Sequence, residues 1–227
     1  MYNLYIANKN YSSWSLRPWI LMRQLSIPFT ERMYSFGSGS FRTFSPSGRV
    51  PCLHDGDTVV WDSLAIVEYL AERHPAVWPA NRAMRAWARC AAAEMHSGFG
   101  VLRQSCGMNC GVRCQLKEVP AALQLDIARI DELWAEGIGR FGGPYLAGSE
   151  FSAVDAFFAP VVFRVRTYGL TLGSVAAEYV RRMLELPAMQ SWLAEALEEP
   201  WRDPAHEDEL RKYGTVTEDQ RSAPPGS

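Results

Sequence analysis

Three serines surround a tryptophan near the start of the chain, in the stretch YSSWSLRP that runs from Tyr11 to Pro18. The stretch follows a short strand-like alternation and precedes a run with helical periodicity, so it stands where a helix begins. A serine at that position can cap the helix, because its side-chain oxygen accepts a hydrogen bond from an unpaired backbone N–H group. The helix dipole also favours anions there, and a thiolate is an anion. The residues alone therefore predict either a plain helix start or a serine hydroxyl that takes part in chemistry.

A second candidate site combines Val50-Pro51 with Asp62-Ser63. The first pair opens a short apolar strand, and the second precedes a helical pattern. A proline can open a strand only where its missing N–H donor does no harm. If the Val50–Pro51 peptide bond is cis, the backbone N–H and C=O of Val50 are free for a ligand, and Ser63 at a helix N-terminus can bind a carboxylate. The alternative is an edge-strand proline followed by a simple N-cap.

Cysteines are further candidates for chemistry. Cys106, Cys110 and Cys114 recur every fourth residue, and His96 lies upstream. On a helix the first and third of these cysteines would be about 12 Å apart, because a helix rises about 1.5 Å per residue. Ligands that far apart cannot share one zinc ion. We therefore expect no metal site, and we expect small buried thiols or part of the lining of a cleft.

The composition limits the expected partners and location. The formal net charge of the 227-residue chain is −2, which gives no field for a polyanion, so nucleic acid is not an expected partner. The sequence has no run of about 18 apolar residues, so no membrane span is expected. The N-terminus lacks the basic and apolar segments of a secretory signal, and an odd count of five cysteines argues against a disulfide framework. A cytoplasmic protein is the expectation.

The expected secondary structure changes character at a linker with two prolines, HPAVWP. Before the linker, alternating and helical patterns give the order β-α-β-loop-β-β-α, an α/β unit of about 75 residues. After it the patterns are helical, and Ser152 with Asp155 forms a capping box that starts a strongly apolar helix. From Pro200 the sequence is polar and rich in proline, and about the last dozen residues are expected to be mobile.

Three motifs together resemble one family. SSWSLR, from Ser12 to Arg17, resembles the serine motif of zeta-like glutathione S-transferases. GRVPCLHDGDTVVWDSLAIVEYLAERHP, from Gly48 to Pro75, resembles the glutathione-holding half of that superfamily. YLAGSEFSAVDAFFAPVV, from Tyr145 to Val162, resembles its C-terminal-domain signature. The chain therefore resembles the cytosolic glutathione S-transferase superfamily, of a zeta-like or bacterial serine type, over about residues 3–200.

The resemblance implies a fold and an assembly. The fold class is α/β plus all-α, with a thioredoxin-like glutathione-binding domain at residues 1–76 and an all-helical C-terminal domain at 81–200. Residues 201–227 form a polar tail that we expect to be partly mobile. Glutathione is the implied co-substrate, a small electrophile the second substrate, and a homodimer the implied assembly.

The resemblance also assigns roles to the candidate residues. Ser12 and Ser13 match the position that hydrogen-bonds the glutathione sulfur, and we expect Ser13 to orient the sulfur while Ser12 caps the helix, or the reverse. The residues implied to hold the rest of glutathione are Arg49 near the glycyl carboxylate, Val50 through its backbone, Pro51 in the cis form, and the pair Asp62 and Ser63 at the γ-glutamyl group.

Substrate specificity is the part that the sequence leaves open. The pocket for the electrophile is expected between the first helix and the helical domain, and its candidate lining residues are Tyr11, Trp14, His96, Phe99, Arg103 and Met108. Trp14 stands where zeta enzymes usually have cysteine, which weakens the transfer of their isomerase activity. The leading function is a glutathione transferase that acts in detoxification. The alternatives are a glutathione-dependent isomerase, dehalogenase or peroxidase, or an interaction module without catalysis.

Overall fold

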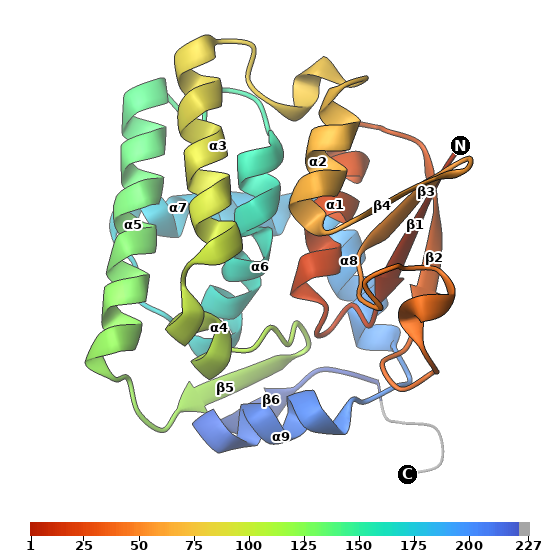
Figure 1. Cartoon of the computed structure of the whole chain (residues 1–227). Helices are drawn as coiled ribbons and strands as arrows, with labels where there is room; N and C mark the ends of the chain where they lie inside the picture. The colour runs from red at the N-terminus through yellow and green to blue at the C-terminus, as the bar shows by residue number, and fades with distance from the viewer. Residues whose placement is uncertain (223–227) are drawn as a thin grey trace.

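The N-terminal part of the chain forms a four-stranded sheet covered by two helices in the computed structural model, which describes residues 1–222 (Figure 1). Its elements are β1 (Tyr2–Ala7), α1 (Ser13–Gln24), β2 (Phe29–Tyr34), a 3-10 turn η1 (Phe41–Thr43), β3 (Cys52–Asp55), β4 (Thr58–Trp61) and α2 (Ser63–Ala71). The strand order is β2-β1-β3-β4; β1 and β2 are parallel, and the other neighbours are antiparallel. The parallel pair requires a crossover, and α1 supplies it. The thioredoxin-like fold expected from the resemblance is confirmed.

The second part of the chain is mainly helical. After the 3-10 turn η2 (Pro75–Val77) its helices are α3 (Arg82–Ser97), α4 (Gly100–Ser105), α5 (Ala121–Phe141), α6 (Ala153–Tyr168), α7 (Ser174–Glu185) and α8 (Pro187–Glu198). Helix α6 is mostly apolar and almost wholly buried, as expected of a helix in the centre of a domain, and its charged residues are Asp155, Arg164 and Arg166. Pro160 is accommodated inside it.

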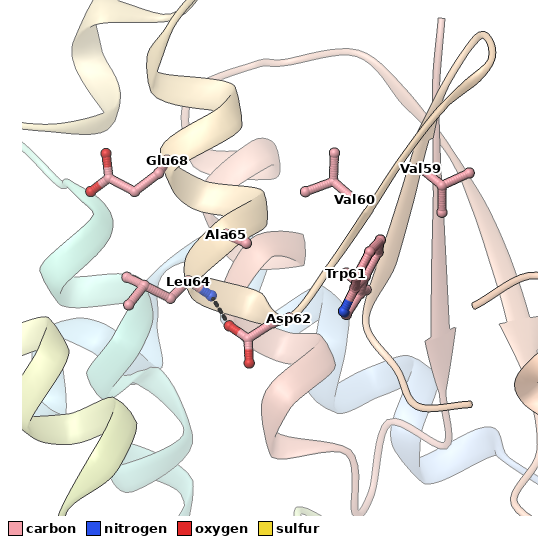
Figure 2. Close-up of a pocket in the computed structure, with 7 residues that line it drawn as sticks. All are labelled: Val59, Val60, Trp61, Asp62, Leu64, Ala65 and Glu68. Atoms are coloured by element: carbon pink, nitrogen blue, oxygen red, sulfur yellow. Dashed lines mark hydrogen bonds between the residues drawn. The ribbon is translucent and has the colours of Figure 1, made fainter. Parts of the chain in front are cut away.

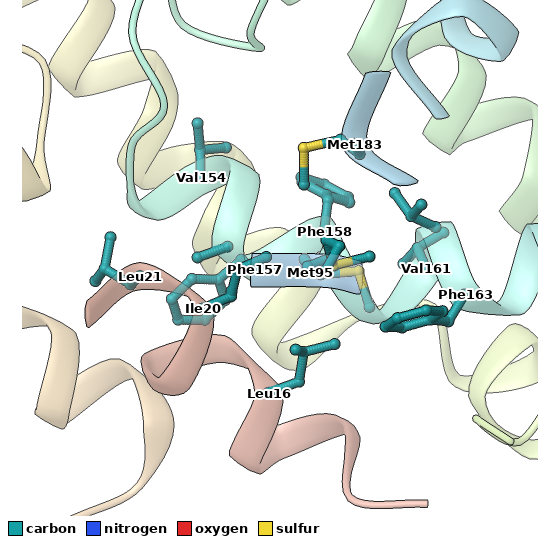
Figure 3. Packing of buried hydrophobic residues seen from close by; sticks show 14 of the residues in the cluster. Leu16, Ile20, Leu21, Met95, Val154, Phe157, Phe158, Val161, Phe163 and Met183 are labelled. Carbon is teal, nitrogen blue, oxygen red and sulfur yellow. The ribbon is translucent and has the colours of Figure 1, made fainter. Parts of the chain in front are cut away.

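The core is continuous between the two parts because α6 packs against both α1 and α3. Figure 3 shows Leu16 and Ile20 of α1 facing Phe157 of α6, with Met95 of α3 close by. All four of these side chains are fully buried. The start of α1, where the serines lie, is therefore held by packing against the helical domain.

The capping box at the start of α6 is buried and hydrogen-bonded as the sequence predicted. The Asp155 carboxylate accepts hydrogen bonds from the backbone N–H groups of Ser152 and Leu146, both at 3.0 Å, and from the Tyr179 hydroxyl at 3.1 Å. Burial raises the pKa of Asp155 to about 6, although these hydrogen bonds favour its ionised form.

The segment after Pro200 departs from the expectation of a polar tail. Residues Pro204–Tyr213 form helix α9, and Gly214–Asp219 form strand β6, which pairs antiparallel with β5 (Val112–Leu116) in a second, two-stranded sheet. Figure 1 places α9 and β6 beside β5 at one end of the molecule. The C-terminal domain is helical, as expected, apart from the short strand β5, and β6 lies in the segment that was expected to be a polar tail. Of the last dozen residues, which were expected to be mobile, residues 216–219 belong to β6, and 223–227 lie outside the described residues.

The cysteines also differ from the helical spacing considered above. Cys106 lies just after α4, Cys110 in the following loop and Cys114 in β5, and all of them are buried free thiols. Burial raises the pKa of each thiol. Residues 1–222 contain no cluster of three or more His, Cys, Asp or Glu side chains placed to hold a metal ion. Within the same residues, no helix combines the length and the apolar character needed to cross a membrane.

Candidate active site

A cavity of about 380 Å³ lies where the start of α1 meets the helical domain. Four parts of the chain converge on it: the β1–α1 connection, the segment after β2, the α4 region with α6, and helix α9. Its lining residues are Tyr11, Ser12, Ser13, Trp14, Phe36, Phe41, Gly48, Arg49, Val50, Arg103, Gly107, Met108, Arg164, His206 and Glu209. The fold thus brings both serines and the Val50 region to one cavity, as the resemblance implied.

The two serines differ in what their hydroxyls do. Ser12 occupies the N-cap position of α1 but makes no side-chain capping bond, so the expectation that it caps the helix is wrong. Its hydroxyl donates instead to Ser15 Oγ at 2.7 Å. Ser13, the first residue of α1, is 8% exposed, and its hydroxyl has no hydrogen-bond partner among residues 1–222. Ser13 therefore retains a donor that can serve a ligand in the cavity.

The backbone of Val50 is also available at this cavity. The Val50–Pro51 peptide bond is cis, as the resemblance implied. Within the described chain, neither the N–H nor the C=O of Val50 is hydrogen-bonded, although Val50 lines the cavity. Arg49 is exposed at the same edge of the cavity. A ligand with an extended peptide backbone can pair with a free N–H and C=O in this way.

Asp62 and Ser63 do not line the cavity. Asp62 is the N-cap of α2, where its side chain accepts a hydrogen bond from Leu64 N–H at 2.8 Å. Ser63 is fully buried, and its hydroxyl accepts a hydrogen bond from Arg17 Nη1 at 3.4 Å. Asp62 lines a different hollow of about 580 Å³ along β4 and α2 (Figure 2).

The expected pocket residues divide into two groups. Tyr11, Trp14, Arg103 and Met108 line the cavity. His96 and Phe99 do not: His96 packs edge-on against Trp14 at 5.2 Å and lies 3.5 Å from the Asp62 carboxylate, whereas Phe99 belongs to the buried core. Burial also lowers the pKa of His96. His96 therefore packs behind Trp14, a lining residue, whereas Phe99 is part of the core.

Seven lining residues were missed by the sequence analysis, namely Phe36, Phe41, Gly48, Gly107, Arg164, His206 and Glu209. Arg164 carried a usable signal, since it is a charged residue within the apolar run of α6. His206 and Glu209 carried none, because they lie in the segment that reads as a polar tail.

Tyr11 is held by the C-terminal segment. Its hydroxyl donates to Glu207 Oε1 at 2.7 Å and accepts from Arg221 Nη1 at 3.1 Å, and Arg221 also pairs with Glu207 and Asp219. Burial and the neighbouring Glu207 raise the pKa of Tyr11 far above its usual value. The Tyr11 hydroxyl therefore already donates its hydrogen bond to Glu207, and Ser13 is the better donor for an anion in the cavity.

Positive charge gathers behind the serines. Arg17 is 1% exposed and stacks 4.1 Å from the Trp14 ring centre. Burial, together with the nearby Arg164 and Arg103, lowers the pKa of Arg17 to about 9. Burial likewise lowers the pKa of Arg164 to about 10. Both shifts come first from burial and then from the neighbouring arginines, and an anion bound here would stabilise the charged guanidinium groups.

Comparison with known proteins identifies the two parts of the chain. Residues 11–73 match the model described as glutathione S-transferase, N-terminal domain, and residues 119–195 match that of the C-terminal domain; together they cover more than half of the chain. Glutathione S-transferase GstB of Escherichia coli is 24% identical over 201 residues, which are 80% of this chain and 86% of that protein. A stringent starvation protein A homolog of Haemophilus ducreyi is 28% identical over 147 residues, covering 63% of this chain and 65% of that protein.

Solved structures share the fold. A glutathione transferase homolog from Burkholderia with bound glutathione aligns with a TM-score of 0.66 at 24% identity, covering 86% of this chain and 97% of that one. Ure2p in complex with glutathione aligns with a TM-score of 0.64 at 16% identity, covering 85% of this chain and 93% of that one. At these identities the likeness establishes the architecture of the chain.

Proposed function

The chain belongs to the glutathione S-transferase family, and from that premise we propose that it binds glutathione in the cavity at the start of α1 and activates its thiol for attack on a small electrophile. The observation that carries the proposal is the Ser13 hydroxyl, which is buried, lines the cavity and is not engaged by another residue among 1–222. A thiol in this place would meet a free donor at the positive end of a helix.

The chemistry follows from the charge of the thiolate. A cysteine thiol has a pKa near about 8.5, so only a small fraction is ionised at neutral pH, and the thiolate is the nucleophile. A serine hydroxyl is too weak an acid to serve as a base, but its hydrogen bond to the sulfur favours the anion. The dipole of α1 contributes about 0.3–1 kcal/mol more in the same direction. Both effects lower the pKa of the bound thiol.

The remaining groups of glutathione have matching partners near the cavity. We propose that the cysteinyl backbone pairs with the free N–H and C=O of Val50, beside Pro51, and that the glycyl carboxylate lies near exposed Arg49. We further propose that the γ-glutamyl ammonium pairs with the Asp62 carboxylate and that the γ-glutamyl carboxylate binds at the N-terminus of α2, where Ser63 lies.

Calorimetric titration with glutathione tests the binding. We expect saturable one-to-one binding in the wild-type protein, and weaker binding when Asp62→Ala removes the carboxylate that would hold the ammonium group. Asp57→Ala is a matched control, since Asp57 lies at the exposed turn between β3 and β4, outside the cavity lining. The absence of heat or of a change in intrinsic tryptophan fluorescence at millimolar glutathione would overturn the proposal.

The second candidate function is that of an interaction module. It is favoured by the stringent starvation protein A homologs among the relatives, one of which is 28% identical. The same cavity and thiolate would also serve a glutathione-dependent isomerase, dehalogenase or peroxidase. Retention on immobilised glutathione, followed by assays with aryl halides, peroxides and maleyl compounds, separates these functions. Failure to bind glutathione would favour the module.

We also propose that the chain forms a homodimer, the assembly expected from the resemblance. An apolar hollow along β4 and α2 is available for it, with Val59, Val60, Leu64 and the 46% exposed Trp61 on its walls (Figure 2). An exposed tryptophan beside aliphatic side chains is typical of a surface that binds another protein. Location in the cytoplasm stays an expectation from the sequence.

A further inference from the structure

Arg164 lines the cavity and carries unused hydrogen-bond donors. It is 4% exposed, and its Nε donates to the backbone oxygen of Cys106 at 2.7 Å. That hydrogen bond fixes the position of the guanidinium group. Within residues 1–222, neither Nη group of Arg164 has a hydrogen bond or an ion-pair partner. A buried guanidinium with free donors beside an open cavity is a built site for an anion.

No carboxylate in the described chain neutralises this charge at close range. Arg17, Arg103 and Arg164 approach one another from α1, α4 and α6, and none of them has a carboxylate within ion-pair distance among residues 1–222. Arg103 donates to the backbone oxygens of Met95 and His96 instead.

The opposite wall offers limited compensation. Glu209 of α9 lines the cavity, and His206 is already paired with Asp203, the N-cap residue of α9. Burying cations without carboxylate partners is costly, so a ligand that supplies negative charge here binds favourably.

We propose that Arg164, assisted by Arg103, binds a carboxylate on the second substrate. This inference rests on the proposed function and names its substrate class: a small, unsaturated or aromatic carboxylic acid with an electrophilic carbon. The guanidinium fork matches a carboxylate with two parallel hydrogen bonds, and the apolar body of such an acid fits against Phe36, Phe41 and Met108 of the same cavity. In a cavity of about 380 Å³ that also holds the sulfur of glutathione, the acid has to be compact.

The alternative ligand for Arg164 is glutathione itself, through one of its carboxylates or its sulfur. The observations favour the second substrate, because Val50, Arg49 and the start of α2 already provide places for the peptide groups of glutathione on the N-terminal domain. Arg103 and Arg164 belong to the helical domain and face the same cavity from the other side.

Binding of a matched acid and amide tests the inference without requiring turnover. The full-length protein, saturated with S-methylglutathione, is titrated calorimetrically with 3-nitrobenzoate and with 3-nitrobenzamide, which have the same body and differ in charge. We expect the acid to bind at least about tenfold more tightly, from the usual contribution of hydrogen bonds to a charged group. Equal affinity of acid and amide for the wild-type protein would overturn the inference.

Variants test whether the preference for the acid over the amide depends on Arg164. Arg164→Met should abolish it, Arg164→Lys should retain part of it, and Arg103→Met should reduce it. Arg166→Met is the matched control, because Arg166 lies on the same helix but bonds Gln220 and is outside the cavity lining. If Arg164→Met weakens S-methylglutathione binding and leaves the ratio of acid to amide unchanged, the arginine serves glutathione and the inference is wrong. Circular dichroism checks that each variant is folded.

Turnover separates this inference from the proposed function. With 4-chloro-3-nitrobenzoate, the glutathione thiolate forms a carbon–sulfur bond as chloride leaves with its electron pair, and the thiol proton passes to solvent. We expect a higher kcat/KM for the acid than for its methyl ester. Turnover of the ester alone would overturn the inference and leave the transferase standing. If glutathione does not bind, the proposed function fails, and the acid and amide titration of the free protein still tests the arginine site.

Discussion

Replacing Ser13 with alanine removes one buried hydroxyl from the start of α1 and leaves the neighbouring contacts in place. Ser13 is 8% exposed, so a hydrogen bond from its hydroxyl to a bound thiolate would be largely shielded from water. A hydrogen bond to a charged group contributes about 1.5–3 kcal/mol, which corresponds to about one to two pKa units. We therefore expect Ser13→Ala to raise the pKa of the bound glutathione thiol by about one to two units.

The direction of this change in the thiol pKa determines how the rate depends on pH. Below the wild-type thiol pKa, a rise of one to two units lowers the thiolate fraction, and hence the rate, by about ten- to a hundredfold. Above the raised pKa both proteins hold glutathione as thiolate, so the difference in rate becomes small. The assay is the ultraviolet absorbance of the bound thiolate as a function of pH, with kcat/KM measured over the same range.

Ser12→Ala is the matched control. The Ser12 hydroxyl donates to Ser15 Oγ at 2.7 Å, so its removal should leave the thiol pKa nearly unchanged. A rise in pKa confined to Ser12→Ala would transfer the role to Ser12. An unchanged pKa in both variants would refute the hydroxyl mechanism.

Three further predictions concern the rest of the molecule. Burial raises the pKa of Asp155 from 3.8 to about 6, so the folded state holds more protons than the unfolded state between these pH values. Stability should then fall as pH rises through this window, by up to about 3 kcal/mol, and Asp155→Asn should flatten the pH dependence of the urea midpoint; an unchanged slope would contradict this. Cys90 is the exposed cysteine and the other four are buried, so one thiol should react quickly with Ellman's reagent, and Cys90→Ala should remove that fast phase. Trp61→Arg, at the apolar hollow along β4, should convert a dimer to a monomer in light scattering; a variant that stays dimeric would move the interface elsewhere.

Much of the fold could be predicted from the sequence because its signals are local. Alternating residues in β1 and the Asp-Gly turn between β3 and β4 identify strands, and Ser152 with Asp155 identifies the start of α6. Ser13 and Trp14 could be placed at a site because a helix N-terminus is itself recognisable in a sequence.

Contacts between distant segments could not be predicted in this way. Strand β5 forms by pairing with β6, and Val112 pairs with Asp219, more than a hundred residues later in the chain. The sequence around β5 alone therefore did not identify it as a strand. The polar composition of the C-terminal segment does not indicate that Glu207 and Arg221 form hydrogen bonds with the Tyr11 hydroxyl.

The lining of the cavity is likewise a matter of tertiary packing. His96 and Phe99 were expected to line the cavity. In the structure Phe99 packs in the hydrophobic core, and His96 packs against Trp14. Arg164 lines the cavity, and a hydrogen bond from its Nε to the backbone oxygen of Cys106 helps to position it there.

The position of the glutathione sulfur tests the central claim most directly. A crystal structure of the wild-type protein soaked with glutathione should place that sulfur within about 3.5 Å of Ser13 Oγ, at the first turn of α1. A sulfur that faces away from both Ser12 and Ser13, or a cavity without glutathione at saturating concentration, would contradict the account.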